Sequence, residues 1–414
     1  MSTVPGGDAR PAPALRLVRS QPVDLVGTLL QRLPRAEGAL AWLRDGHGLV
    51  GWGEAARLEV SGPDRFAVAQ AWWRELVAGC TVDDTVGVRG SGPVAFGSFA
   101  FAEDEPSVLV VPEVTLGRMG GRTWLTTVGD PPRLALPEPV TRPGALRYAR
   151  GQVTVTDFRA AVERAVARID AGELDKVVLA HDLLAVADED IDVRFVLDGL
   201  TEANPGCWAF AVDGLVGATP ELYVGRDGDR VVSRVLAGTT ARGGDAADDS
   251  ARVEALLHSG KDLEEHRYAV ESLVDALAPH VRDLEVEVAP HALELSNVTH
   301  LATDVSASLV DGSDVLDLVA ALHPTAAVGG TPTPVALEAL RELELMDRGG
   351  YAGPVGWVDA RGDGEWGIAL RCAQLAGRSA RLFAGCGIVA GSDPDAEVLE
   401  AQAKFVPVRD ALEG

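Results

Sequence analysis

Residues that could bind a charged ligand gather near the end of the chain. A glycine-rich run, residues 385–389, precedes a helix that should begin at Pro394, because proline suits a first helical turn. Glu397, Glu400 and Lys404 stand three and four residues apart, so they share one face of that helix. Two carboxylates and an ammonium group beside a glycine-rich strand can hold a hard cation and an anion together. A solvated helix face with ordinary ion pairs has the same spacing, so both interpretations remain open here.

The composition is that of an acidic globular protein. The chain has 414 residues, of which 47% are hydrophobic and 24% charged, and its formal net charge is −25. This length exceeds the usual size of one compact core, so one large core or two closely packed layers are expected. The negative charge argues against nucleic acid as a partner, because a phosphate backbone requires a basic face. An anionic small molecule would need local arginine, lysine, backbone N–H groups or a metal ion.

The expected location follows from what the sequence lacks. It contains no apolar run that approaches a membrane span, and its N-terminus has no basic-then-apolar signal pattern. The cysteines are far apart and form no C-x-x-C pair, which favours small core residues in a reducing cytoplasm. They are Cys80, Cys207, Cys372 and Cys386. We therefore expect a cytoplasmic protein without a membrane segment.

Changes in composition divide the chain. Residues 1–14 are rich in proline, glycine and alanine and are predicted to be disordered. Residues 15–145 show mostly strand signals and no catalytic constellation, and the segment 129–144 is a proline-rich connection. Residues 150–414 contain all the candidate site residues. The two halves are expected to pack together as one domain.

The second half begins with a helix and a strand. Residues 154–171 form an amphipathic helical pattern that Gly172 ends, and residues 174–186 form a strand pattern. Lys176 shares one face of this strand with apolar residues. It is either a charged residue that protects an exposed strand edge or a buried lysine that can act as a base.

Periodicity places three other candidate residues in ordinary surroundings. Glu221 stands at the start of a strand, where glutamate is usually solvated. Ser259 is the predicted N-cap of a long helix, and Glu265 points away from its apolar stripe, which predicts an exposed side chain. That stripe consists of Leu263, Val270, Val274 and Leu277. Arg371 is predicted to lie in the middle of a strand, where a guanidinium group needs an anion as its partner.

Taken in chain order, these stretches resemble the chorismate-utilising enzymes, which include isochorismate synthase, salicylate synthase, anthranilate synthase component I and aminodeoxychorismate synthase. One motif of this kind is weak, but the whole series follows the order of the family. The N-terminal half matches only loosely. The matching stretches are residues 176–179, 217–222, 236–239, 261–266, 297–301, 323–325, 351–357, 370–373 and 385–404.

The resemblance implies an α+β fold in which two antiparallel sheets pack face to face, helices lie outside and the active site lies in the cleft between the sheets. It also implies a Mg²⁺ cofactor held by Glu265 and Glu400, with Glu397 in support. This contradicts the exposed position that periodicity gives to Glu265. Mg²⁺ is a hard cation that keeps several waters and needs only one or two protein carboxylates plus a substrate oxygen.

The same resemblance implies how chorismate, a dianion, is bound. Arg371, with Tyr351 nearby, would take the enolpyruvyl carboxylate. Lys404 and the N–H groups around Gly385 and Gly387 would help to hold the ring carboxylate. The metal ion would compensate for the negative charge of the protein.

The choice of reaction within the family depends on a few residues. The resemblance assigns Lys176 to the members that use water as the nucleophile, where it would take the proton of the attacking water. Glu221, on the opposite face of the ring, would give a proton to the departing allylic hydroxyl, a task that requires a raised pKa. His323 would line the pocket in a role that the sequence does not specify. Ala327 stands where the pyruvate-eliminating members usually carry threonine.

These features favour an isochorismate synthase, with a salicylate synthase as the alternative. An amino-transferring enzyme with a glutaminase subunit is disfavoured by Lys176, and an inactive chorismate-binding relative is disfavoured by the paired acid and base. Ala180 and His181 depart from the Ser-Arg pair usual in this motif, which is interpreted as a packing change. The product could lead to menaquinone, a siderophore or salicylate. A monomer is plausible, because nothing in the sequence demands a partner.

Overall fold

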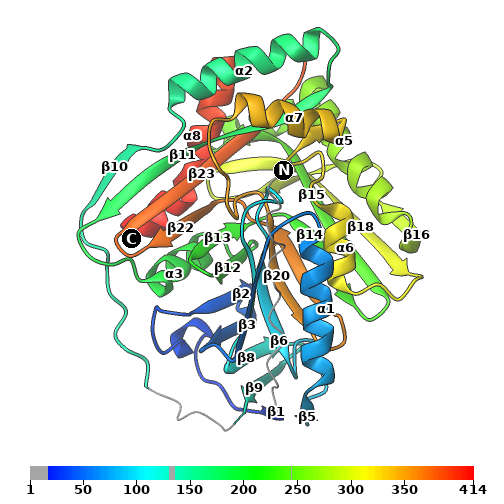
Figure 1. Ribbon diagram of the computed structural model, residues 1–414. Helices are drawn as coiled ribbons and strands as arrows, with labels where there is room; N and C mark the ends of the chain where they lie inside the picture. Colours follow the sequence, from blue (N-terminus) through cyan, green and yellow to red (C-terminus); the bar gives the residue numbers. More distant parts are fainter. Residues whose placement is uncertain (1–16, 130–135, 244) are drawn as a thin grey trace, which may run out of the picture.

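The computed structural model of the protein describes residues 17–129, 136–243 and 245–414. The segment 1–14, which was predicted to be disordered, lies outside these residues. Two large β-sheets dominate the described part, and eight α-helices and a short 3₁₀ helix (Leu30–Arg32) accompany them (Figure 1). None of these helices is long and apolar enough to cross a membrane.

The first sheet has 13 strands, and all their pairings are antiparallel except the parallel pair β1–β5. The strands of the two halves of the chain form two blocks in this sheet, which meet where β12 pairs with β2 of the N-terminal half. The order is β10 (Leu146–Arg150), β11 (Lys176–Ala187), β23 (Ser379–Ile388), β22 (Cys372–Ala376), β13 (Leu215–Thr219), β12 (Trp208–Val212), β2 (Leu40–Arg44), β3 (His47–Trp52), β8 (Val114–Met119), β9 (Arg122–Val128), β1 (Leu17–Pro22) and β5 (Thr81–Asp84), with β19 (Gly330–Thr331) also beside β11.

The second sheet has ten strands, and all its pairings are antiparallel. The order is β16 (Val281–Val286), β18 (Val298–Leu309), β15 (Arg230–Ala241), β14 (Leu222–Asp227), β21 (Gly364–Ile368), β20 (Pro354–Asp359), β6 (Val94–Ser98), β7 (Ser107–Val111) and β4 (Ala56–Val60), with β17 (His291–Glu294) beside β18. Trp42 of the first sheet donates a hydrogen bond from Nε1 to Glu365 Oε2 of the second sheet at 2.8 Å, which ties the two layers together.

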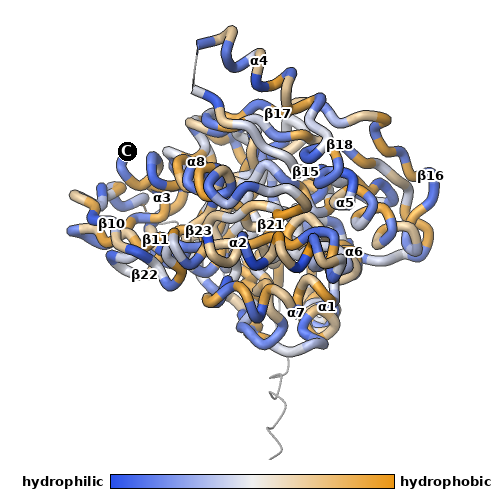
Figure 2. The backbone as a smooth tube through the Cα atoms, turned by 90° about the horizontal axis from the view of Figure 1, so that it is seen from above, coloured by the Kyte–Doolittle hydropathy of each residue, from blue (hydrophilic) through white to orange (hydrophobic). Residues whose placement is uncertain are grey.

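The helices cover the outer faces of the sheets, so the predicted α+β arrangement is confirmed. One group packs on the first sheet and its core: α2 (Val155–Asp170), α3 (Val193–Ala203), α7 (Thr333–Leu343) and α8 (Pro394–Glu413). The other group packs on the second sheet: α1 (Arg65–Ala78), α4 (Ala246–Leu257), α5 (Gly260–Leu277) and α6 (Val315–Leu322). Hydrophilic and hydrophobic residues alternate along helices such as α5 and α7 (Figure 2).

Hydrogen-bonding side chains set the starts of three helices, and Ser259 is the N-cap of α5 as predicted. Thr154 and Asp157 form a capping box at the start of α2, and Ser259 accepts a hydrogen bond from the Asp262 N–H at the start of α5. Asp393 caps α8 in the same way, immediately before Pro394. In each case the oxygen of a side chain satisfies a free N–H group of the first helical turn.

The predicted apolar stripe of α5 is confirmed at Leu277 and wrong at its other three residues. The buried residues of this helix are His266, Ala269, Leu273 and Leu277, whereas Leu263, Val270 and Val274 are only partly buried. The cause is His266, whose ring nitrogens lie 3.2 Å from Ala237 O of β15 and 2.8 Å from Thr303 Oγ1 of β18. These polar contacts turn the helix so that Glu265 also faces the interior, which a search for apolar residues alone cannot detect.

Arg371 does not lie in the middle of a strand, contrary to the prediction. It lies where the chain crosses from β21 in the second sheet to β22 in the first, with a backbone φ of 47°. Glu221 lies at another crossing, between β13 and β14. The two crossings are adjacent, because the Ile368 N–H donates to Glu221 O and the Ala218 N–H donates to Arg371 O. The fold therefore brings these two ionisable side chains to the junction between the sheets.

Candidate active site

Lys176 is buried at the start of β11, so the alternative of an exposed edge residue is excluded. Its side chain is 0% exposed, and its Nζ lies 3.3 Å from Glu265 Oε1 of α5. Nζ also donates to the Glu265 backbone oxygen at 3.5 Å. The strand and the helix, which belong to opposite layers, are thus joined through one lysine and one carboxylate.

The glycines of β23 make room for this pair. Gly387 lies opposite Val178 in the ladder between β11 and β23. A Cβ atom on Gly387 would overlap the Glu265 carboxylate and approach Lys176 Cε to 2.9 Å. Any larger residue at position 387 would therefore displace the two charged groups. Gly385, two residues earlier, accepts a hydrogen bond at its backbone oxygen from Lys404 Nζ at 2.9 Å.

The charged face of α8 points inward rather than to solvent. Glu397 is 2% exposed and its Oε1 lies 2.6 Å from Lys261 Nζ of α5. Glu400 Oε1 lies 2.6 Å from Lys404 Nζ, one turn along the same helix. Together with Lys176 and Glu265, these residues form three lysine–carboxylate pairs between β11, α5 and α8. Lys261 lies in the matching stretch 261–266 but had no predicted role, and its neighbours along the helix gave no signal for one.

The three carboxylates are chemically suited to a hard divalent cation. Ligand atoms of Glu397 and Glu400 lie within 4.8 Å of each other and of Cys386 Sγ, whereas Glu265 stands outside that group. Burial raises the pKa of Glu265, Lys176 lowers it, and the negative charges of Glu400 and Glu397 raise it further, which places these carboxylates in one electrostatic environment. Burial also raises the pKa of the Cys386 thiol far above its usual range, so the carboxylates are the better ligands.

Glu221 is a buried carboxyl group, contrary to the solvated position expected at a strand start. It is 4% exposed, and its Oε1 accepts a hydrogen bond from the Leu236 N–H at 3.3 Å. Burial raises the pKa of Glu221 to about 8, against the opposing effect of that hydrogen bond and of Lys176, Arg371 and Lys404. At neutral pH this side chain is mainly a protonated acid that can donate a proton.

Arg371 is buried without a carboxylate partner among the described residues. Its Nη2 lies 2.7 Å from His300 Nε2, and its buried Nε makes no hydrogen bond. Because arginine only donates, His300 Nε2 must accept, which places the histidine proton on Nδ1, near Thr239 Oγ1 at 3.0 Å. Burial lowers the pKa of both Arg371 and His300. A buried guanidinium group with unused donors is suited to an anionic ligand.

Tyr351 lies close enough to Arg371 for the charge of each to perturb the pKa of the other. Its ring stacks on Phe383 of β23, with ring centroids 5.2 Å apart, and burial raises its pKa. The role of His300 as a partner of Arg371 was missed, since the sequence shows it only as one residue of the motif 297–301. Its function in orienting Arg371 depends on the pairing of β15 with β18, which only the folded chain displays.

His323 and Ala327 follow α6, and His323 contacts residues other than the charged ones above. His323 Nε2 lies 3.0 Å from Phe101 O, and its ring packs among Phe66, Phe101 and Tyr223. It lines a cavity of about 590 Å³ whose wall includes none of the three lysine–carboxylate pairs. Ala327 is partly buried at the edge of the core. Their roles at the substrate remain predictions.

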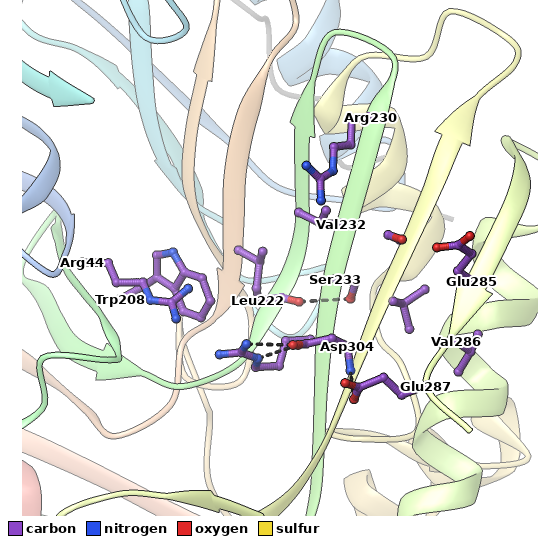
Figure 3. A pocket seen from close by; sticks show the side chains of 13 residues that line it. Arg44, Trp208, Leu222, Arg230, Val232, Ser233, Glu285, Val286, Glu287 and Asp304 are labelled. Atoms are coloured by element: carbon purple, nitrogen blue, oxygen red, sulfur yellow. Dashed lines mark hydrogen bonds and ion pairs between the residues drawn. The ribbon is translucent and has the colours of Figure 1, made fainter. Parts of the chain in front are cut away.

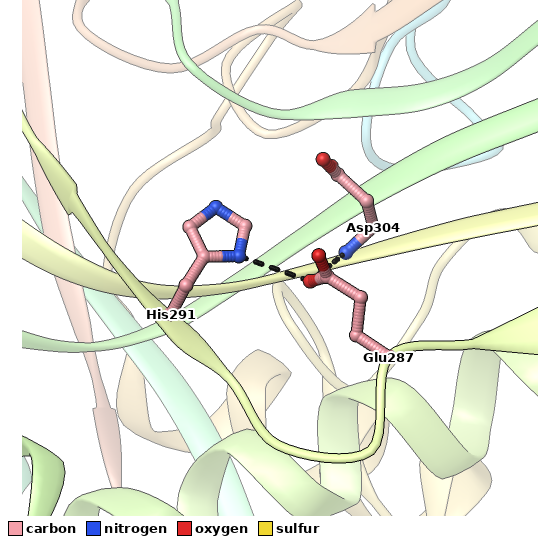
Figure 4. A group of neighbouring side chains, drawn as sticks. All are labelled: Glu287, His291 and Asp304. Atoms are coloured by element: carbon pink, nitrogen blue, oxygen red, sulfur yellow. Dashed lines mark hydrogen bonds and ion pairs between the residues drawn. The ribbon is translucent and has the colours of Figure 1, made fainter.

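A second group of titratable residues is a structural network rather than a metal site. Ligand atoms of Glu287, His291 and Asp304 lie within 4.8 Å of one another (Figure 4). However, Asp304 holds Arg234 through two hydrogen bonds of 2.6 and 2.9 Å, and Glu287 Oε2 accepts from both His291 and the Asp304 N–H. The adjoining cavity of about 510 Å³ is lined by residues of β2, β12, β14, β15, β16 and β18 (Figure 3), and Lys176 is not one of its lining residues.

Comparisons with known proteins identify the class to which this site belongs. Residues 18–129 and 137–413 match the family described as chorismate binding enzyme. The chain belongs to this family, as the resemblance predicted.

Individual relatives cover most of the chain. Isochorismate synthase DhbC of Bacillus subtilis is 38% identical over 327 residues, which cover 76% of this chain and 79% of that protein. The salicylate biosynthesis isochorismate synthase of Pseudomonas aeruginosa is 34% identical over 407 residues, with 91% and 85% covered.

Solved structures have the same fold. MenF, the menaquinone-specific isochorismate synthase of Escherichia coli, superposes with a TM-score of 0.79 at 25% identity over 95% of this chain and 94% of its own. Anthranilate synthase component I of Streptococcus pneumoniae superposes with a TM-score of 0.71 at 20% identity, over 88% of this chain and 92% of its own, which shows the shared fold alone.

Proposed function

We propose that this protein is an isochorismate synthase, which converts chorismate to isochorismate by adding water to the ring and displacing the allylic hydroxyl group. The observation that carries the proposal is the burial of a lysine and a protonated carboxyl group in one electrostatic environment. Lys176 is 0% exposed, and its charge is among the causes that perturb the pKa of Glu221. The relatives named isochorismate synthase support the same activity.

Each of the two residues handles one proton. Lys176 Nζ, released from Glu265 and acting as the neutral amine, takes a proton from the attacking water as the new carbon–oxygen bond forms and becomes an ammonium group. Glu221 gives its proton to the departing hydroxyl group as the old carbon–oxygen bond breaks and the ring double bonds shift. One water enters and one water leaves, so no redox step or organic cofactor is required.

Charge recognition would hold the substrate in place for these transfers. Arg371, fixed by His300, has an unused Nε donor for the enolpyruvyl carboxylate, with Tyr351 beside it. Lys404 would contribute its ammonium group to the ring carboxylate, near Gly385 O. The low exposure of these residues keeps competing water away from the charged contacts.

Glu265 and Glu400, with Glu397 in support, are the residues that would hold Mg²⁺. When bound, the cation would supply positive charge opposite the substrate ring carboxylate. Within the protein, lysine side chains neutralise these carboxylates. When substrate binds, Lys176 would leave Glu265 to contact the attacking water, and Lys404 would leave Glu400 to contact the substrate. A cytoplasmic, monomeric enzyme without a glutaminase subunit accords with this proposal. Both siderophore-type and menaquinone-specific relatives exist, so the destination of the product is left open.

Product analysis tests the proposal. The purified protein is incubated with chorismate and Mg²⁺ in the absence of ammonia, with Lys176→Ala as the matched inactive variant. Isochorismate that approaches an equilibrium mixture with chorismate is the expected result. Salicylate with equal amounts of pyruvate would place the enzyme in the eliminating branch, and an aminated product on addition of ammonia would place it among the amino-transferring members. Binding of chorismate without turnover would contradict an enzymatic role.

A further inference from the structure

The strand that carries Lys176 has a gap in its hydrogen-bonding ladder. One edge of β11 pairs with β23 along residues 177–186. The other edge pairs with β19 at residues 176–177 and with β10 at residues 183–187, so residues 178–182 have no strand partner there within the described sheet. The gap begins two residues after Lys176, and backbone groups in it must find other partners because the strand is buried.

A buried ion pair, Glu344 with Arg348, fills this gap. Glu344 Oε2 accepts from the Ala180 N–H at 2.9 Å, and Arg348 Nη2 donates to Val178 O at 2.7 Å. The two side chains bind each other through two hydrogen bonds of 2.6 and 2.8 Å. They are 5% and 3% exposed. The pair thus replaces a missing strand with side-chain donors and acceptors.

The same guanidinium group also holds the neighbouring loop. Arg348 Nη1 donates to Val328 O at 3.0 Å, and Val328 directly follows Ala327. The Val178 N–H in turn donates to Gly329 O at 3.0 Å, which fixes the loop to β11 from the strand side. The Arg348 backbone oxygen accepts from the Tyr351 N–H at 2.9 Å. One arginine therefore links the strand of Lys176, the loop of Ala327 and the turn that leads to Tyr351.

Stability alone does not account for this arrangement. Burying two charges costs several kcal/mol of solvation, and replacing such a pair by apolar residues is often neutral or stabilising. What the pair adds is a fixed register, because a forked donor bonded to two carbonyl oxygens and a carboxylate permits only one alignment of the segments. Misplacement of a reacting group by about 1 Å can cost about a hundredfold in rate.

We propose that Glu344 and Arg348 are positioning residues that set the location of Lys176 relative to the loop 325–329, and thereby determine the rate of the chemical step. This inference rests on the proposed function for its kinetic part. It also has a purely structural consequence, which is that the loop and β11 are held together by Arg348.

The test compares the double variant Glu344→Gln/Arg348→Met with a matched control. Asp192 and Arg194 form an equally buried forked pair, 3% and 5% exposed, in which Arg194 also donates to backbone oxygens, including Leu33 O. The control is therefore Asp192→Asn/Arg194→Met. We expect the first variant to lose about ten- to a hundredfold in kcat, normalised to the folded fraction, with KM changed by less than about threefold. The control should keep the kcat of the wild type, whatever its loss of stability.

Two further measurements separate positioning from a general loss of structure. Arg348→Lys keeps the charge beside Glu344, but its point-like ammonium group cannot reach Val178 O and Val328 O together, so its kcat should fall between wild type and the double variant. Amide hydrogen exchange at Val178, which donates to Gly329 O, should become faster in the double variant and not in the control.

Equal kcat values in the wild type and the Glu344/Arg348 variant, or equal losses in that variant and the control, would overturn the inference. Failure of the wild-type protein to form isochorismate would instead count against the proposed function. In that case hydrogen exchange decides, because faster exchange at Val178 in the Glu344/Arg348 variant alone supports the structural link, and unchanged exchange refutes it.

Discussion

Replacing Glu221 by glutamine would test whether this side chain is a buried acid. A glutamine side chain has the shape of the protonated carboxyl group and can still accept the hydrogen bond from the Leu236 N–H. It can neither ionise nor give up a proton. The variant should therefore fold, lose about 10²- to 10⁴-fold in kcat, and change the pH dependence of stability.

The expected size of the stability effect follows from the pKa of Glu221. Burial raises that pKa from 4.5 to about 8, so the folded state favours the protonated form. Its contribution to stability is complete below about pH 4.5, where both states are protonated, and is lost as the pH rises through about 8. The complete change corresponds to about 5 kcal/mol, since one pKa unit is about 1.4 kcal/mol. Between about pH 5.5 and about pH 7.5, ionisation of Glu221 should lower the free energy of unfolding of the wild type by about 3 kcal/mol. The Glu221→Gln variant has no such group and should show no corresponding loss.

The assay is urea unfolding of both proteins, without chorismate or Mg²⁺, at several pH values in this window. The difference between their free energies of unfolding should shift by about 3 kcal/mol in favour of the variant. Asp359→Asn is the matched control, because burial also raises the pKa of Asp359, whose oxygens accept from the Gly90 and Arg361 N–H groups. That control should affect the pH dependence of stability but not kcat. Parallel stability curves for Glu221→Gln and wild type would refute the buried acid.

Three other substitutions test the remaining roles. Lys176→Ala should fold and bind chorismate but lose about 10²- to 10⁴-fold in kcat, and turnover near the wild-type value would rule out the base assignment. Glu400→Ala should raise the Mg²⁺ concentration needed for half-maximal activity about tenfold or more and weaken chorismate binding with it, whereas an unchanged Mg²⁺ titration would show that this carboxylate is not a ligand. Arg371→Lys should raise the KM for chorismate by about ten- to a hundredfold, because a charged hydrogen bond contributes about 1.5–3 kcal/mol, and an unchanged KM would contradict its role in carboxylate recognition.

Much of the local structure could be predicted because it depends on neighbours in the sequence. The caps at Thr154, Ser259 and Asp393 lie where short polar side chains precede a helical pattern. The shared face of Glu397, Glu400 and Lys404 follows from helical spacing alone. Whether that face meets solvent or the interior does not follow from spacing, because it depends on Lys261 of a distant helix.

Three site residues show what sequence patterns could not determine. Glu265 was assigned to the surface because the buried face of its helix includes His266, whose polar contacts come from β15 and β18. Glu221 was assigned to solvent and Arg371 to a strand, although both occupy crossings between the two sheets. Periodicity describes residues within one helix or strand. A crossing lies between the end of a strand in one sheet and the start of the next strand in the other sheet, so it is defined by the tertiary fold.

The sequence by itself determined the helix ends, the strand patterns and, through the ordered motifs, the family to which the chain belongs. The tertiary structure decided the environments: a lysine on a strand became a buried partner of Glu265, and a glutamate at a strand start became an acid with a pKa of about 8. The physical reason is that residue types and hydrogen-bonding caps are local properties. Desolvation and charge pairing arise only when β11, α5 and α8 are brought together by the fold.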